Sequence, residues 1–139
     1  MMKTKELIKQ VLEKWNFPVL QEREKSLVFR YEMSYIQINI PGDEDCNAIA
    51  VTLSGFFTAN NDKEMALGLR TCNLLNYELF QVKLYIDRDN DLVIAAEFFF
   101  STPEDIESLL TNGLKTVIGA KRRFNPQYEE FEKEGSATE

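Results

Sequence analysis

Hydrophobic residues recur at helical spacing in three stretches of the chain. Near the N-terminus they stand one, three and four positions apart, which predicts an amphipathic helix over residues 4–15. The same spacing predicts a helix over residues 62–77 and a third one that begins after Thr102. This last helix has the clearest start signal, because Thr102 can act as its N-cap and Pro103 suits its first turn. Gly119 is a candidate C-cap.

Between these helices the pattern changes to an alternation of hydrophobic and polar residues, which is typical of strands with one buried face. The predicted strands cover residues 17–22, 27–32, 35–40, 48–57, 81–87 and 92–100, the first of them short and weakened by Pro18. Short polar turns join neighbouring strands and favour antiparallel pairing. The predicted fold class is therefore α+β: an antiparallel sheet of about five or six strands with three helices, in the order α-β-β-β-α-β-β-α.

The strand over residues 92–100 differs from the others because it is hydrophobic on both faces. One face carries Leu92, Ile94, Ala96, Phe98 and Phe100, and the other carries Val93, Ala95 and Phe99, interrupted only by Glu97. A strand of this kind is covered on both sides, either by helices of its own chain or by a second subunit. The candidate partner-contact residues are Val93, Ala95 and Phe99, with Phe57 as an additional candidate.

Length and composition are those of one folded domain with a distinct end. The chain has 139 residues, of which 44% are hydrophobic and 12% aromatic, so it can form a hydrophobic core without disulfides or metals. Residues 126–139 contain five glutamates and one lysine, a net charge of −4. We expect a single domain over residues 1–125, followed by an acidic, mobile tail over residues 126–139.

The charged residues argue against two classes of function. Acidic side chains outnumber basic ones by 23 to 16, the opposite of the excess that nucleic-acid binding requires. The chain has no histidine, which is the commonest general base and neutral metal ligand, and its two cysteines match no zinc motif. The short basic cluster at residues 121–123 suits a helix C-terminus. We therefore expect no nucleic-acid partner, no catalytic residue and no cofactor.

One turn deserves comparison with a calcium-binding loop. Asp87, Asp89 and Asp91 alternate as in the opening of such a loop, but Leu92 and Phe98 occupy the positions where glycine and glutamate are required. The pattern favours a polar hairpin turn, with the three aspartates kept as a weak metal candidate. A small-ligand or metal-sensing domain, using this turn or a pocket between helix and sheet, is the alternative function.

No stretch of the sequence indicates a membrane or secretion signal. The N-terminal residues alternate lysine and glutamate without a continuous apolar segment, and the longest apolar runs are far too short to cross a bilayer. We expect a cytoplasmic protein with no membrane partner.

Several local patterns in the second half resemble the YbjN family, a group of candidate bacterial sensory transduction regulators. The helix end Thr71-Cys72-Asn73-Leu74-Leu75-Asn76 is similar to an N-x-L-N helix end of that family. The stretch from Val82 to Val93 is similar to its strand–D-x-D-G-D–strand signature, with Asn90 where glycine is usual. The start of the last helix at Ser101-Thr102-Pro103-Glu104 matches as well.

The resemblance covers roughly residues 4–124 and implies the fold of type III secretion chaperones. It carries no catalytic residue. It implies a non-enzymatic cytoplasmic regulator or chaperone-like protein that binds another protein and forms a homodimer. Chaperones of this fold bind extended segments of their partners along apolar patches and strand edges.

Overall fold

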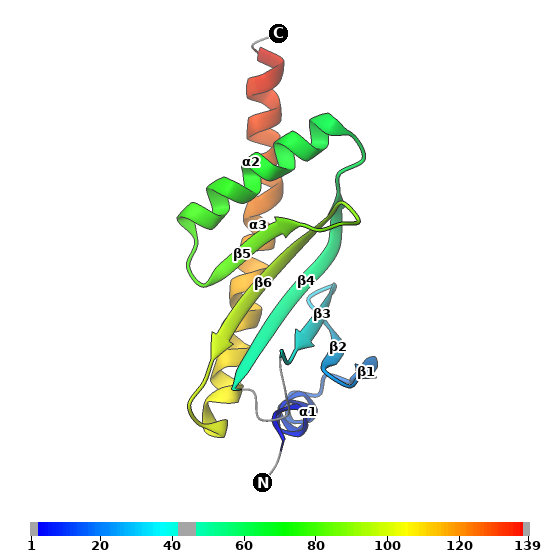
Figure 1. The fold of residues 1–139 in the computed structure, drawn as a ribbon, viewed down its shortest axis with the longest axis vertical. Helices are drawn as coiled ribbons and strands as arrows, with labels where there is room; N and C mark the ends of the chain where they lie inside the picture. The colour runs from blue at the N-terminus through cyan, green and yellow to red at the C-terminus, as the bar shows by residue number, and fades with distance from the viewer. Residues whose placement is uncertain (1–2, 42–46, 138–139) are drawn as a thin grey trace.

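The chain forms a helix, four strands, a second helix, two strands and a third helix, in that order (Figure 1). The computed structural model describes residues 3–41 and 47–137. Its helices are α1 (Thr4–Lys14), α2 (Asp62–Glu78) and α3 (Ile106–Ala137), and a 3-10 turn, η1 (Pro103–Asp105), leads into α3. Its strands are β1 (Gln21–Arg23), β2 (Ser26–Tyr31), β3 (Ser34–Asn39), β4 (Ala48–Thr58), β5 (Val82–Ile86) and β6 (Asp91–Phe99).

The strands of the described residues form one antiparallel sheet in the order β1-β2-β3-β4-β6-β5. The two longest strands, β4 and β6, are neighbours in it, with Val51 opposite Ala96. The predicted α+β class is confirmed, with six strands and three helices. The first strand, β1, begins at Gln21, whereas the prediction placed it over residues 17–22, and it has only three residues. It begins farther along the chain because Asn16 has a left-handed conformation (φ 63°) and Pro18 has no N–H to donate to the sheet.

The helices cover one face of this sheet. In Figure 1, α3 runs behind β4 and β6, α1 lies at the end where β1 and β2 lie, and α2 crosses α3 alongside β5. The strand residues that point toward the helices are large, and each is at most 3% exposed. They are Leu27, Phe29, Ile36, Ile38, Ile49, Val51, Leu53, Leu84, Leu92 and Ile94. Over β4 and β6, no helix of the described residues covers the opposite face, which is turned toward the viewer.

A glycine brings α3 close to the sheet. A Cβ atom at Gly113 would lie only 2.7 Å from Val51 Cγ2 of β4 and 3.2 Å from Phe98 Cε2 of β6. Any larger residue would therefore push the helix away from the two central strands. The glycine costs helix propensity but permits the close contact that buries this part of the core.

α3 is longer than the sequence pattern predicts. The helix does not end near Gly119 but continues through Pro126 to Ala137. Residues 126–137, which the sequence assigns to an acidic tail, are therefore helical. The glutamates of this segment point to solvent, while Tyr128 and Phe131 extend the packed stripe of the helix.

Aromatic contacts hold the end of α3 in place. The ring of Tyr128 lies 5.2 Å from that of Phe57 in β4, and Phe131 is only 8% exposed. The guanidinium of Arg70 in α2 lies 3.8 Å from the centre of the Phe131 ring and 3.1 Å from a carboxylate oxygen of Glu134. This packing offsets the hydrogen bond that Pro126 cannot donate inside the helix.

Candidate functional site

The uncovered face of the sheet, here called the open face, contains the residues expected to contact a partner. On β6 it presents Val93, Ala95, Glu97 and Phe99, because successive side chains of a strand alternate between its faces. Their neighbours on β4 are Ser54, Thr52, Ala50 and Ala48, respectively. On the other side of β6, Tyr85 of β5 is opposite Val93 and Lys83 is opposite Ala95.

The three expected contact residues of β6 share the open face but differ in how much surface they offer. Phe99 is 90% exposed, Val93 is half-buried, and Ala95 is 3% exposed because its small side chain lies between longer neighbours. Phe99 also borders a hollow of about 420 Å³ at the end of the sheet, together with Pro41, Ala48 and Phe98. Most of the apolar contact area that β6 can offer a partner therefore belongs to Phe99.

The structure places Phe57 away from the open face. Its ring lies 5.1 Å from Phe124 and 5.2 Å from Tyr128, both in α3. It also lies where it would contact a Cβ atom at Gly68 of α2. The bulge around Gly55 (φ 87°) bends the end of β4 toward these helices. Phe57 therefore belongs to the packing within the chain.

The open face is polar on one half and apolar on the other. Over β3 and β4, Gln37 donates to Asn39 at 2.7 Å, and the Thr52 hydroxyl donates to the Gln37 carbonyl at 2.8 Å. Over β5 and β6, an ion pair joins Lys83 to Glu97 at 2.8 Å. The hydrogen bond to Glu97 raises the pKa of Lys83. The apolar contact area is therefore concentrated on the β5–β6 half.

The free edge of β5 is occupied by a side chain of α2. The Asn76 amide donates to the Leu84 carbonyl at 3.0 Å, and its oxygen accepts from the Leu84 N–H at 2.8 Å. Both backbone groups of Leu84 are thus paired in the way a neighbouring strand would pair them. An incoming strand would have to displace this amide, so strand addition at β5 is disfavoured.

The opposite edge of the sheet is short. β1 contains three residues, and the Lys5 ammonium of α1 donates to the Arg23 carbonyl at 3.3 Å. Lys5 and Lys9 also pair with Glu22 at 3.1 and 3.0 Å, and these contacts lower the pKa of Glu22. A strand this short, with α1 beside it, offers little for a further strand to pair with.

The aspartate turn uses its carboxylates internally. Asp87 Oδ1 accepts from the N–H groups of Asp89 and Asp91 at 2.9 and 3.0 Å, and Asp91 accepts from the Thr58 hydroxyl at 2.5 Å. Asn90 has a left-handed conformation (φ 65°), which explains why this position suits glycine. Among the described residues, no cluster of three or more acidic or cysteine side chains could hold a metal ion.

The basic cluster is also accounted for within the chain. Lys121 donates to the Ser34 hydroxyl at 2.8 Å, Arg122 pairs with Glu32 at 3.0 Å, and Arg123 pairs with Glu78 at 2.6 Å. These residues lie in the middle of α3, not at its C-terminus as expected. They connect α3 to the β2–β3 turn and to the end of α2.

Two further observations concern reactivity and membranes. Cys72 is buried in α2, and burial raises the pKa of its thiol to about 11, so it carries almost no thiolate at neutral pH. Within residues 3–41 and 47–137, no helix is both long and apolar enough to cross a membrane.

Sequence reasoning missed exposed aromatic residues near the β5–β6 half. Tyr77 at the end of α2 is 88% exposed, and Phe80, two residues before β5, is 95% exposed. Tyr77 lies beside the helical stripe and Phe80 in a loop, so neither belongs to a periodic pattern. Their exposure follows from where α2 ends, which only the structure shows.

Solved structures with the same fold include proteins of bacteria and archaea. One is "YbjN, a putative transcription regulator from E. coli", with a TM-score of 0.61, 14% identity, and coverage of 94% of this chain and 93% of that one. A second is an uncharacterized protein from Methanothermobacter thermautotrophicus, with a TM-score of 0.59, 18% identity, and coverage of 91% and 97%. A third is the Yersinia pestis type III secretion chaperone SycH, in complex with a stable fragment of YscM2. Its TM-score is 0.50 at 10% identity, with coverage of 84% and 98%.

The fold therefore defines an α+β protein of the class that includes a secretion chaperone. Residues 4–125 match the family described as "YbjN: Putative bacterial sensory transduction regulator". The chain belongs to the YbjN family, as its second half indicated. No curated protein sequence matches it.

Proposed function

We propose that this chain is a non-enzymatic, cytoplasmic regulator or chaperone-like protein that binds another protein and forms a homodimer through the open face. The observation that carries the proposal is the exposed Phe99 on a sheet face that no helix of the described residues covers. Large exposed aromatic side chains are the usual energetic centres of protein interfaces.

The state of the two sheet edges supports a face as the contact surface. Asn76 occupies the exposed groups of Leu84 at the β5 edge, and β1 is only three residues long. Contact through backbone hydrogen bonds is therefore disfavoured at both ends of the sheet. Side chains on the open face are the remaining means of contact.

The distribution of side chains supports the β5–β6 half in particular. Val93 and Phe99 lie on β6, Tyr85 on β5 is 42% exposed, and Phe80 lies two residues before β5. Between Val93 and Phe99, the small side chain of Ala95 leaves room on the open face for a side chain of the partner. Contact over β3 would remove water from the hydrogen-bonded pair Gln37 and Asn39, which is costly. On the β5–β6 half the corresponding cost falls on the Lys83–Glu97 ion pair.

The family and the fold agree with this proposal. The YbjN family is described in terms of regulation, and SycH, which shares the fold, is named with a bound protein fragment.

Native mass spectrometry of the tagged full chain, captured gently from its own host, tests the proposal. We expect a homodimer that carries a second protein, and we expect Phe99→Glu to lose both. Met33→Glu is the matched control, because Met33 is 85% exposed but lies in the turn between β2 and β3. A bare monomer, or a Phe99→Glu variant that keeps the same partner, would contradict the proposal.

A further inference from the structure

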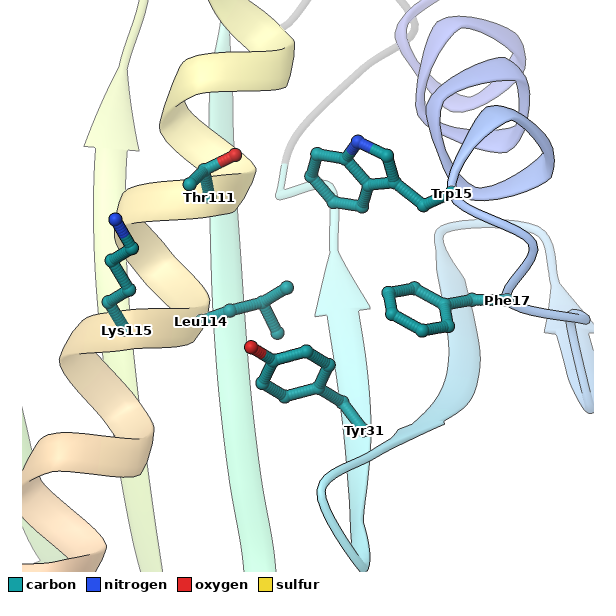
Figure 2. A pocket seen from close by; sticks show the side chains of 6 residues that line it. All are labelled: Trp15, Phe17, Tyr31, Thr111, Leu114 and Lys115. Atoms are coloured by element: carbon teal, nitrogen blue, oxygen red, sulfur yellow. The ribbon is translucent and has the colours of Figure 1, made fainter.

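A second apolar hollow lies on the helix side of the sheet, where α1 and α3 diverge. Trp15, Phe17 and Tyr31 form one wall, from the end of α1, the following loop and the end of β2 (Figure 2). Three residues of α3 form the other wall: Thr111, Leu114 and Lys115. This α1–α3 cleft has a volume of about 410 Å³, within the usual range for small-molecule sites.

The aromatic wall is fixed in place before any ligand binds. Phe17 is stacked on the fully buried Phe29 at 5.7 Å and meets Tyr31 edge-on at 5.6 Å. The end of α1 holds it there, because the Phe17 N–H donates to the Leu12 carbonyl and the left-handed Asn16 donates to Glu13. A rigid wall of this kind loses little conformational entropy on binding.

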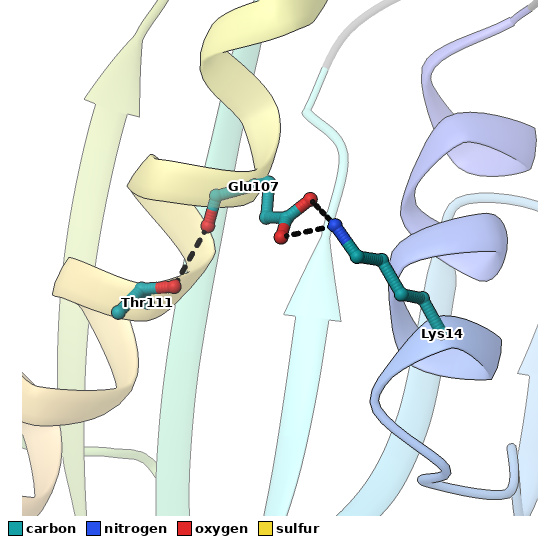
Figure 3. Close-up of polar contacts among 3 residues, drawn as sticks. All are labelled: Lys14, Glu107 and Thr111. Atoms are coloured by element: carbon teal, nitrogen blue, oxygen red, sulfur yellow. Dashed lines mark hydrogen bonds and ion pairs between the residues drawn. The ribbon is translucent and has the colours of Figure 1, made fainter.

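The rim of the cleft carries an uncompensated positive charge. The Lys115 side chain is exposed, and among the described residues its ammonium has no hydrogen bond or ion pair. The acidic residue one helical turn before Thr111 is already engaged: the Glu107 carboxylate pairs with Lys14 of α1 at 2.9 Å (Figure 3). The Glu107 carbonyl accepts from the Thr111 hydroxyl at 3.0 Å.

We propose that the α1–α3 cleft binds a small planar aromatic anion, of the aromatic carboxylate or sulfonate type. The aromatic wall provides offset and edge-on contacts for a flat ring, and Lys115 provides the counter-charge. This proposal goes beyond the proposed function, since the cleft lies on the covered side of the sheet. A bound ligand would contact both α1 and α3, which gives a regulator a means of sensing a metabolite.

Trp15 makes the proposal directly testable, because it is the one tryptophan of the chain. The probe is 8-anilinonaphthalene-1-sulfonate, an aromatic anion that accepts energy from tryptophan. Its uncharged analogue N-phenyl-1-naphthylamine reports on the apolar contribution alone. With the full chain, we expect saturable energy transfer from Trp15 to the sulfonate.

Two variants separate the charge from the cavity. We expect Lys115→Gln to weaken binding of the sulfonate by about threefold to tenfold, as for the loss of a partly exposed ion pair. The affinity for the uncharged analogue should not change. Lys63→Gln, at the start of α2, is the matched control and should change the affinity for neither probe. Thr111→Phe, at the half-buried rim, should fill the cleft and weaken the binding of both probes.

The outcomes are distinct. Absence of saturable energy transfer, or binding that Thr111→Phe leaves intact, would overturn the site. Equal affinity for both probes, with no effect of Lys115→Gln, would overturn the anionic ligand and assign the cleft to an apolar side chain of a protein partner. Phe99→Glu should leave probe binding unchanged, which separates this test from that of the open face.

Discussion

The two faces of the central strand β6 have similar hydrophobicity but opposite environments. Toward the helices, Leu92, Ile94 and Ala96 are completely buried in the core. On the open face, Val93 is half-buried, Ala95 is shielded by its neighbours, and Phe99 is almost fully exposed. Hydrophobicity on both sides of a strand thus identifies a central strand, but it does not show which side its own chain covers.

The difference between the faces lies in side-chain size. The covered face is built mainly from leucine, isoleucine, valine and phenylalanine, which need helices above them. The open face uses Ala48, Ala50 and Ala95, each at most 8% exposed although no helix covers them. Small residues are shielded by adjacent strands, so Phe99 is the open-face residue of β6 whose apolar surface would be buried only by a partner.

The largest expected effect comes from shortening equivalent side chains on the two faces of β6. We expect Ile94→Ala to lower the free energy of unfolding by about 2–5 kcal/mol, because it leaves a cavity in the core. Val93→Ala, one residue away on the open face, should cost about 1 kcal/mol or less. Urea unfolding at one fixed protein concentration measures both, and equal losses would remove the distinction between the faces.

A glycine pair tests how closely α3 is packed on the covered face. We expect Gly113→Ala to destabilise the protein by about 1–3 kcal/mol, because the new methyl would collide with the stiff Val51 side chain. Gly119→Ala in the same helix has open space around it and should stabilise by about 0.5–1 kcal/mol. Urea unfolding again measures both; a stabilised Gly113→Ala variant would mean that α3 lies farther from the sheet.

The β5 edge gives an intermediate effect. We expect Asn76→Ala to lose about 1–2 kcal/mol, since two hydrogen bonds to Leu84 disappear. The exposed Asn73, one turn earlier in α2, provides the control, and Asn73→Ala should change stability little. Light scattering should also show more self-association for Asn76→Ala, because its sheet edge is open. Unchanged scattering would indicate that α2 itself blocks the edge.

The smallest effect concerns the ion pair that joins α1 to α3. Lys14 and Glu107 are both exposed, so a double-mutant cycle with Lys14→Met and Glu107→Gln should give a coupling of about 0.2–1 kcal/mol. High salt should reduce this coupling. A larger, salt-insensitive value would show that the pair contributes more to closing the covered face than its exposure suggests.

Periodicity predicted most of the fold but not the end of α3. Regular spacing from Ile106 to Ile118 identified the helix, whereas Pro126 and the glutamates around it gave the composition of a solvated tail. The stripe formed by Phe124, Tyr128 and Phe131 continues the helical period, and it was the available signal. Its partners lie in α2 and β4, so its burial depends on contacts between distant parts of the chain.

The candidate sites were predictable only in part for the same reason. Alternation correctly placed Val93, Ala95 and Phe99 on one face, but their exposure depends on where the helices pack. The pairing of Asn76 with Leu84 joins a side chain to a backbone across a loop, which no periodic pattern records. The α1–α3 cleft likewise joins residues that are far apart in the sequence.

Sedimentation equilibrium of the full chain across the micromolar range shows whether the open face is the contact surface of the protein. We expect a dimer for the wild type and for Met33→Glu, and a folded monomer for Phe99→Glu. A wild-type chain that stays monomeric, or a Phe99→Glu variant that dimerises as strongly as the wild type, would contradict it.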